Sequence, residues 1–359
     1  MSNVVAMKLE LPSTPVQELV KSNTGKQIPD RYVFNPKTNT SESSNFDDND
    51  DAVVPWMESP VIDFQQLLLD SQHEMHKLRS VLTSWGCFQL INHGTVSSKI
   101  DQLRQVSKEF FALPLEQKQK YSRTVDWFEG YGNDTVSEGQ PFNWNDRLHL
   151  KIYPVDQRNV KLWPEIPSKF RETLDAYAVE VRKLLENMLK VIAKSLNLEE
   201  ESFYNQFGEE EGIMFSRFNY YPPCPSPDQV FGLKPHSDVT LITILLQDTE
   251  VHGLQVLKDD QWFKVPIVPD AFFINVGDQL EIMSNGILKS VVHKVVIDKQ
   301  RERMSVAVAS SPPPDKEIGP VSELIDEERP QLYKNVKNYL ATFLQYIARS
   351  ERAIDAMKI

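Results

Sequence analysis

The sequence predicts an α+β protein, in which a mainly helical N-terminal half precedes a β-rich core. The segment 167–196 carries apolar residues three or four positions apart, the spacing that places them on one buried face of a long helix. After Gly212 the chain changes to short stretches that are rich in β-branched and aromatic residues and separated by Pro, Gly, Asp or Asn. Several strands at this spacing are typical of a sandwich, a barrel or a jelly roll.

The elements before the long helix follow from local patterns. Residues 36–59 are polar and acidic and bury too little apolar surface to offset the entropy of ordering, so we expect a mobile loop there. A short strand at 60–64, a helix and a second strand at 86–94 come next. Two helical pieces are then expected between 97 and 121, with a break at Pro114.

The composition is that of an ordinary soluble protein, with 359 residues of which 40% are hydrophobic and 25% charged. The net charge of −12 and the lack of a dense Lys/Arg cluster give no basic surface for nucleic acid or for an anionic membrane. No run of about 18 apolar residues would span a bilayer. The only cysteines, Cys87 and Cys224, suggest no disulfide framework, so we expect a cytoplasmic protein.

A candidate metal site begins in "GLKPHSDVTLITILLQD" (232–248), where His236 and Asp238 lie at the mouth of an apolar strand. Polar residues also lie at strand mouths for solvation alone, so these two do not decide the matter. His293, in the apolar stretch "SVVHKVVI", offers a third ligand, although a lone histidine in a strand is usually structural. Two imidazoles and one carboxylate leave three positions of an octahedral ion open, which is the arrangement of non-haem Fe(II) oxygenases.

Strand alternation aligns further polar residues, because side chains two positions apart point the same way. Arg303 begins an otherwise apolar strand, and its fork of donors suits bidentate binding of a carboxylate, with the Ser305 hydroxyl beside it. The alternative is that Arg303 pairs with a protein carboxylate at the edge of the barrel. The aligned sets are His236 with Asp238, Arg303 with Ser305, and Arg217 with Asn219 and Tyr221.

Several motifs together resemble the plant 2-oxoglutarate- and Fe(II)-dependent dioxygenases. The C-terminal motifs are "HSD" (236–238), the distant His293, "RMS" (303–305), "NYYPPCP" (219–225) and "NVGDQLEIMSNG" (275–286). "PVIDF", "WGCFQLINHG" and "FFALPLEQKQKY" resemble the N-terminal region of that family, so the similarity spans roughly residues 55–350. Within the family, the sequence is most similar to the branch of senescence-related proteins and opium poppy alkaloid O-demethylases.

The resemblance implies a double-stranded β-helix, or jelly-roll, core flanked by N-terminal and C-terminal helices. It also implies an enzyme that uses Fe(II), 2-oxoglutarate and O₂, with ascorbate as reductant. Four regions are then expected: an N-terminal extension with the acidic loop (1–59), a mainly helical region (60–205), the jelly-roll core (206–312) and a C-terminal helical segment (313–359) with a helix at about 330–349. Carried over by position, the implied iron ligands are His236, Asp238 and His293, and the implied 2-oxoglutarate contacts are Arg303, Ser305, Tyr221 and Asn219.

Substrate contacts are also suggested by the resemblance, because in related enzymes the segment "NWNDRLHLKIYP" approaches the substrate. The candidate pocket residues are Arg147, His149, Arg217, Ala309 and Ser311. The implied reaction is hydroxylation or O-demethylation of a plant specialised metabolite, a phenolic or an alkaloid, with succinate and CO₂ as co-products and no obligate protein partner. Two alternatives stay open: an iron oxidase of the same fold that does not use 2-oxoglutarate, and a non-catalytic jelly-roll protein whose triad holds zinc.

Overall fold

The structure is a computed structural model that describes residues 9–22, 27–34, 54–124, 128–208, 210–347 and 352–359. The acidic loop predicted at 36–59 lies outside the described residues as far as position 53. The described ranges contain every residue that the sequence singles out for the site.

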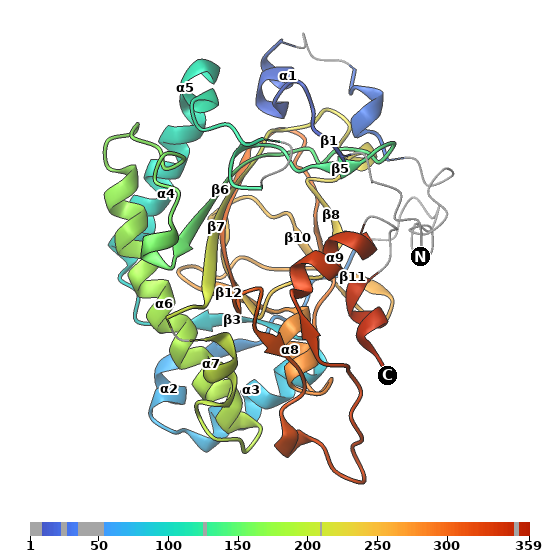
Figure 1. Ribbon diagram of the computed structural model, residues 1–359. Helices are drawn as coiled ribbons and strands as arrows, with labels where there is room; N and C mark the ends of the chain where they lie inside the picture. The colour runs from blue at the N-terminus through green and yellow to red at the C-terminus, as the bar shows by residue number, and fades with distance from the viewer. Residues whose placement is uncertain (1–8, 23–26, 35–53, 125–127, 209, 348–351) are drawn as a thin grey trace.

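An eight-stranded major sheet and a four-stranded minor sheet form the centre of the molecule (Figure 1). Neighbouring strands pair antiparallel except β2 and β3, which pair parallel. In spatial order the major sheet contains β2 (Val61–Asp63), β3 (Cys87–Ile91), β12 (Phe272–Val276), β9 (Ile242–Leu246), β14 (Arg303–Ser311), β7 (Ile213–Tyr221), β6 (Asp146–Tyr153) and β4 (Gly130–Gly132). The minor sheet contains β11 (Gln261–Lys264), β10 (Leu254–Lys258), β13 (His293–Val295) and β8 (Leu233–His236).

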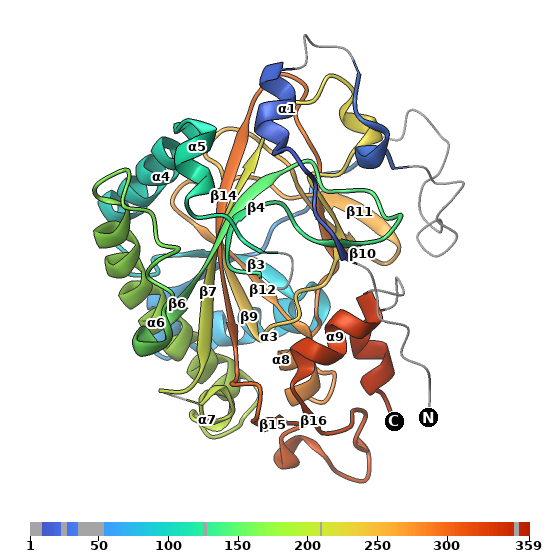
Figure 2. The ribbon, with the colours of Figure 1, turned by 45° about the horizontal axis from the view of Figure 1, so that its top comes forward.

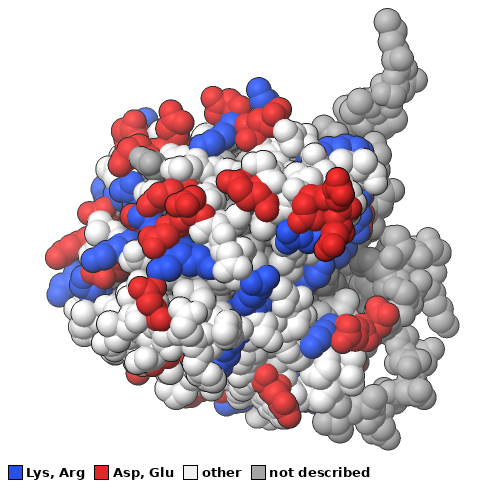
Figure 3. Space-filling model, turned by 90° about the horizontal axis from the view of Figure 1, so that it is seen from below, with Lys and Arg blue, Asp and Glu red and all other residues white. Residues whose placement is uncertain are grey.

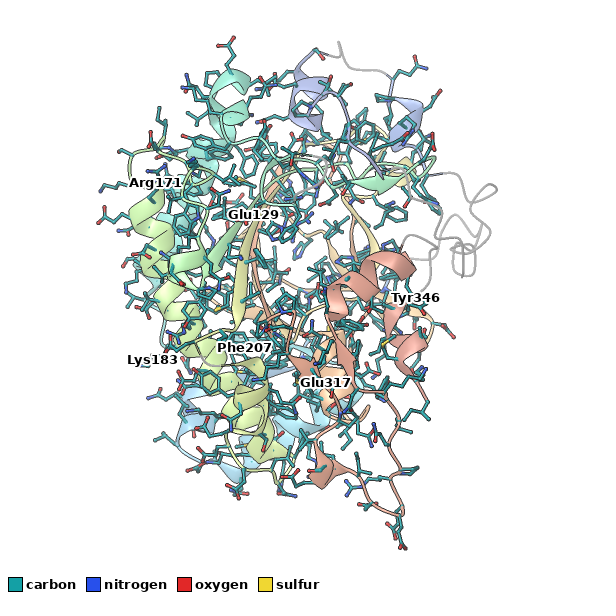
Figure 4. All side chains as sticks on the ribbon, in the orientation of Figure 1. Glu129, Arg171, Lys183, Phe207, Glu317 and Tyr346 are labelled. Atoms are coloured by element: carbon teal, nitrogen blue, oxygen red, sulfur yellow. The ribbon has the colours of Figure 1, made fainter. Side chains whose placement is uncertain are left out.

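Helices cover the outer face of the major sheet. The long predicted helix is α6 (Phe170–Ser195), which packs against α4 (Ser97–Ala112) and α3 (Gln72–Ser84). Figure 1 shows α4 and α6 along β6 and β7. In Figure 4, side chains fill the space between this helical layer and the sheet. Phe207 of α7 is labelled there. The other helices are α1 (Val16–Ser22), α2 (Phe64–Leu68), α5 (Leu115–Gln119), α7 (Ser202–Phe207), α8 (Asp278–Met283) and α9 (Tyr339–Ile347).

Alternation along the strands divides the major sheet into an outer and an inner face. On β7, Met214 and Phe218 belong to the hydrophobic core beneath the helices, as does Val306 on β14. The residues between them, such as Arg217 and Ser305, therefore point to the inner face, toward the minor sheet. The inner face is where this jelly roll presents polar side chains.

Three parts of the chain differ from the sequence expectations. Residues 146–153 form strand β6, so the N-terminal half contributes to the major sheet as well as to the helical layer. Residues 278–283 form helix α8 within a stretch that composition predicts as strand. The C-terminal helix begins at Tyr339 rather than near 330, because Val336–Lys337 (β16) pairs with Glu317–Ile318 (β15).

The C-terminal helix α9 lies beside α8, on the opposite side of the sheets from α4 and α6 (Figures 1 and 2). The Tyr339 hydroxyl donates to Oδ2 of the buried Asp278 at 2.9 Å.

Two features bear on possible partners. Over the described ranges, no helix combines the length and the apolar character needed to cross a bilayer. On the face shown in Figure 3, acidic and basic side chains are interspersed.

Candidate active site

Three side chains that could hold a metal meet where the minor sheet joins the major sheet. His236 ends β8, His293 begins β13, and the two residues are paired in register. Asp238 lies in the connection that leads to β9. One ligand atom of each residue lies within 4.8 Å of the others, and Asp238 Oδ1 is 3.8 Å from Nε2 of each histidine. This spacing lets the three atoms face one ion.

Backbone carbonyls select the imidazole tautomer that a metal requires. Nδ1 of His236 lies 2.8 Å from the Lys234 oxygen, and Nδ1 of His293 lies 3.3 Å from the Val291 oxygen. Because a carbonyl only accepts, each Nδ1 carries a proton, and in the neutral ring Nε2 is then the nitrogen with a free lone pair. Burial and the neighbouring His293 lower the pKa of His236 to about 4, so this ring is neutral near pH 7.

The carboxylate of Asp238 is oriented from its far side. Asn275 Nδ2 donates to Oδ2 at 3.3 Å, which leaves Oδ1 toward the histidines. The Asp238 carbonyl accepts from the Asp278 N–H at 2.8 Å, so the start of α8 fixes the backbone of this connection. Two imidazole nitrogens and one carboxylate oxygen, all on one side of the ion, fit Fe(II) with three positions left open.

The alternation argument is wrong for His236 and Asp238. Strand β8 ends at His236, and Asp238 lies in a connection between the two sheets rather than on the same strand. The connection is held in place by close backbone contact, because a Cβ added at Gly277 would lie 2.0 Å from the Thr240 oxygen. The two candidate ligands therefore converge from a strand end and a loop.

Arg303 lies on the inner face of β14, opposite Tyr221 of β7. It is 3% exposed, and its guanidinium carbon lies 5.2 Å from the centre of the Tyr221 ring. Its Nε and Nη1 are buried and have no hydrogen-bond partner among the residues that the structure describes. Nor does Arg303 form an ion pair with any carboxylate within the described ranges, so the alternative of a protein partner has no support there. A buried fork with unused donors fits the carboxylate of a ligand.

The space for this guanidinium depends on a glycine. A Cβ at Gly253 would lie 2.9 Å from Cδ of Arg303 and 2.9 Å from the Val296 oxygen. Both separations are shorter than a normal carbon contact, so a side chain at this position would displace either the arginine or the backbone. The chain therefore keeps the cradle of Arg303 open with Gly253.

A polar row extends from Arg303 along the inner face. Ser305 and Asn219 are register partners, and Asn219 Nδ2 lies 3.4 Å from Ser305 Oγ. Ser305 is also hydrogen-bonded to Tyr221, whose pKa is raised by burial, so the phenol is protonated near pH 7. Here the predicted alignments of Arg303 with Ser305, and of Arg217 with Asn219 and Tyr221, are confirmed, because β7 and β14 pair in unbroken register.

Arg147 and Arg217 share one carboxylate, that of Asp134. Asp134 Oδ1 accepts from Arg147 Nε at 2.8 Å and from Arg217 Nη1 at 2.9 Å, and Oδ2 accepts from Arg217 Nη2 at 2.8 Å. Arg147 is 2% exposed and also donates from Nη1 to the Phe128 oxygen at 2.8 Å. Burial alone would raise the pKa of Asp134, but the two guanidiniums hold it well below its ordinary value.

His149 lies on the inner face of β6, in register with Arg217. Its ring makes edge contacts with Phe128 at 5.3 Å and with Phe215 at 5.2 Å between ring centres. Nε2 is buried and has no hydrogen-bond partner among the described residues. Burial, together with Arg147 and Arg217, lowers the pKa of His149 well below its ordinary value, so the ring is neutral.

Ala309 and Ser311 lie toward the other end of β14 from Arg303. Both are half-buried on the inner face, and Ala309 is in register with Phe215. Ser311 Oγ accepts from Gln279 Nε2 of α8 at 3.0 Å. The structure thus places Ala309 opposite the aromatic residues around His149, and it ties Ser311 to α8.

Two residues that shape the site are missing from the sequence expectations. Asp134 lies between the short strands β4 and β5 (Val136–Ser137), where no periodicity marks it. Gly253 precedes β10 and reads only as a turn residue. The one available signal was the surplus of arginines at 147 and 217, since buried guanidiniums require an acidic partner.

Comparisons with known proteins identify the family. A model of the 2OG-Fe(II) oxygenase superfamily matches residues 212–312, and one for the N-terminal region of the non-haem dioxygenase in morphine synthesis matches residues 59–166. Protein SRG1 of Arabidopsis thaliana is 36% identical over 349 residues, 96% of each chain. Codeine O-demethylase of Papaver somniferum is 41% identical over 335 residues, covering 91% of this chain and 89% of that protein.

A solved structure extends the likeness to three dimensions. The crystal structure of JOX2 in complex with 2OG, Fe, and JA is 34% identical in sequence, covers 97% of this chain and 98% of its own, and has a TM-score of 0.86. The predicted α+β fold with a jelly-roll core, the predicted family and the predicted enzyme class are confirmed. The chain therefore belongs to the plant 2-oxoglutarate- and Fe(II)-dependent dioxygenases of the 2OG-Fe(II) oxygenase superfamily.

Proposed function

We propose that this enzyme hydroxylates or O-demethylates a plant specialised metabolite, a phenolic or an alkaloid, with succinate and CO₂ as co-products. The observation that carries the proposal is the presence of two complementary sets of side-chain atoms in one jelly roll, one suited to a metal and the other to a carboxylate. Lone pairs converge from His236, Asp238 and His293, and unused guanidinium donors of Arg303 lie along the same jelly roll. The relative named codeine O-demethylase supports the demethylation arm.

The proposed roles follow from the donor sets. His236, Asp238 and His293 hold the metal, and their Nδ1 hydrogen bonds and the Asn275 contact keep the ligand atoms aimed inward. Arg303 and Ser305 bind the distal carboxylate of 2-oxoglutarate, and Tyr221 and Asn219 contact the same co-substrate. When bound, the iron and 2-oxoglutarate supply the activation of O₂ that the oxidation needs. Ascorbate is the proposed reductant that keeps the iron ferrous.

The substrate wall is proposed to consist of His149 and Arg217 with Ala309 and Ser311, supported by Arg147 behind them. The aromatic rings of Phe128 and Phe215 flank His149 at 5.3 Å and 5.2 Å between ring centres. Aromatic edges and faces pair favourably with a planar aromatic ligand. The unpartnered Nε2 of His149 offers that ligand one hydrogen bond. This combination supports a phenolic or another aromatic substrate with a polar substituent.

The test is a screen of plant phenolics and alkaloids with the purified enzyme, Fe(II), 2-oxoglutarate and ascorbate, read by product mass. A gain of one oxygen assigns hydroxylation, and a loss of CH₂ with release of formaldehyde assigns O-demethylation. Succinate is measured in the same samples. Product formation in the complete absence of 2-oxoglutarate would instead identify an iron oxidase of the same fold and overturn the proposed co-substrate site.

A further inference from the structure

The Asp134 carboxylate forms the centre of a hydrogen-bonded cluster between the substrate wall and the co-substrate row (Arg303, Ser305, Asn219 and Tyr221). It accepts from both guanidiniums described above and also from Asn143 Nδ2, at 3.0 Å. These donors come from β6, from β7 and from the segment that leads into β6. A charged acceptor with partners from separate strands fixes their relative positions more firmly than any one pair does.

One of the two arginines continues the hydrogen-bond network and the other does not. Arg217 uses both of its terminal nitrogens on Asp134, and its Nε donates to Asn219 Oδ1 at 2.7 Å. That bond fixes the orientation of the Asn219 amide, so that Nδ2 is the atom that faces Ser305 Oγ, 3.4 Å away. Arg147 donates from Nη1 to the Phe128 carbonyl instead. The network therefore runs from Asp134 through Arg217 and Asn219 to Ser305.

From this arrangement we infer that Asp134 is a positioning residue for the 2-oxoglutarate site, acting through Arg217 and Asn219. The inference rests on the proposed role of Ser305 and Asn219 in binding 2-oxoglutarate. Asp134 does not touch the co-substrate; it sets the guanidinium whose Nε orients the Asn219 amide. A disturbance on the substrate wall at Arg217 is thereby transmitted to the co-substrate row.

The asymmetry between the two arginines supplies the test. Asp134→Asn keeps the shape of the side chain but replaces one acceptor with an NH₂ group that faces guanidinium donors. Arg217→Lys keeps the charge, but a lysine has one nitrogen and cannot donate from two nitrogens to Asp134 and from a third to Asn219. Arg147→Lys disturbs the same carboxylate and leaves the Arg217–Asn219 hydrogen bond in place, although Arg147 is the register partner of Asn219. Asp156→Asn, at an exposed position of the turn 155–157, is the matched control.

The readout is the dissociation constant of 2-oxoglutarate, measured by calorimetry on protein loaded with Mn(II), which requires no turnover. Asp134→Asn and Arg217→Lys are expected to raise this constant by about three- to tenfold, the loss expected for one or two weakened hydrogen bonds. The double variant is expected to show little further loss, because both changes break the same network. Arg147→Lys and the control are expected to leave the constant unchanged, and the Mn(II) affinity is expected to stay constant throughout.

Several outcomes would overturn the inference. One is a lower melting temperature in Asp134→Asn and Arg217→Lys with an unchanged constant for 2-oxoglutarate, which makes the cluster purely structural. Another is an equal loss in Arg147→Lys and Arg217→Lys, which removes the relay through Asn219. If Asp134→Asn does not fold, Arg217→Lys against Arg147→Lys decides alone. A wild-type protein that fails to bind 2-oxoglutarate at all refutes the proposed function instead, so the two failures are distinguishable.

Discussion

His236 and His293 face each other directly across the minor sheet, with ring centres 4.3 Å apart. The pairing joins the last residue of one strand to the first residue of its neighbour, so both rings project where the sheet ends. Two imidazoles at this distance, each with Nδ1 bound to a backbone carbonyl and each beside the same carboxylate, are arranged as they would be to share an ion. The strand register thus brings the two candidate metal ligands together.

The first prediction concerns these ligands. His236→Ala, Asp238→Ala and His293→Ala are each expected to abolish turnover and sharply reduce the iron content, because three protein ligands are the minimum for this open site. The melting curve is expected to stay close to that of the wild type. His73→Ala, on the exposed face of α3, serves as the control. Near-normal activity in any one of the three variants would remove that residue from the site.

The second prediction concerns Arg303. Arg303→Ala is expected to weaken 2-oxoglutarate binding by about 2 to 4 kcal/mol, because the lost pair lies in a buried cradle and its carboxylate would remain without a partner. Calorimetric titration of 2-oxoglutarate into wild type and variant measures this difference. Arg301→Ala is the matched control, since that arginine is exposed and pairs only locally with Asp298. Indistinguishable affinities for Arg303→Ala and wild type would favour the oxidase alternative.

Regular strands explain which parts of the site were predictable from the sequence. Arg303 and Ser305 lie on β14, and Asn219 and Tyr221 lie on β7, two nine-residue strands that pair along their whole length. Over such strands, alternation decides which side chains share a face. His293 lies on a strand of only three residues, so alternation says nothing of it; its combination with His236 and Asp238 suggests it, and the family motifs support it.

Loops explain the part that was not predictable. Asp134 lies 13 residues from Arg147 and 83 from Arg217 in sequence, in a connection with no periodicity to reveal its direction. The pairing depends on the register of β6 with β7, which composition does not encode locally. For the same reason the sequence suggests Arg147 and Arg217 as pocket residues but gives no indication that one carboxylate holds both.

The third prediction concerns the N-terminal helix and pH. Both oxygens of Asp146 accept from the start of α1, from the Val16 and Gln17 N–H groups at 2.8 Å each. Burial raises the pKa of Asp146 from its ordinary value of 3.8 to about 6. A raised carboxyl pKa means that the folded state binds the proton more tightly, so this contribution to stability is full below pH 4 and is lost as pH rises through 6.

Comparison with Asp146→Asn removes from the pH profile the titrations that do not depend on the charge of Asp146. Between pH 4 and pH 7 the free energy of unfolding of the wild type is expected to fall relative to that of Asp146→Asn by up to about 3 kcal/mol. Urea unfolding at several pH values measures the free energy of unfolding of both proteins. Parallel pH profiles, or a difference of the opposite sign, would show that the hydrogen bonds from α1 outweigh the burial of the charge.

The last prediction concerns substrate selection at His149. The ring lies on the same inner face as Arg217 and Asn219, between Phe128 and Phe215, and its Nε2 has no partner among the described residues. His149→Phe removes this hydrogen-bonding atom but keeps an aromatic ring of similar size. The variant is expected to retain the affinities for iron and 2-oxoglutarate, because the ring of His149 packs against Phe128 and Phe215, which belong to neither proposed ligand set.

The expected change in His149→Phe is in the product. A substrate that loses its hydrogen bond turns in the site, so the ratio of products shifts, or succinate forms in excess of product because the reacting C–H bond is misplaced. Measuring succinate and product in the same reaction gives the coupling ratio. If His149 only packs between Phe128 and Phe215, the variant loses thermal stability while its product ratio and coupling match the wild type, and His149 is withdrawn from the substrate wall.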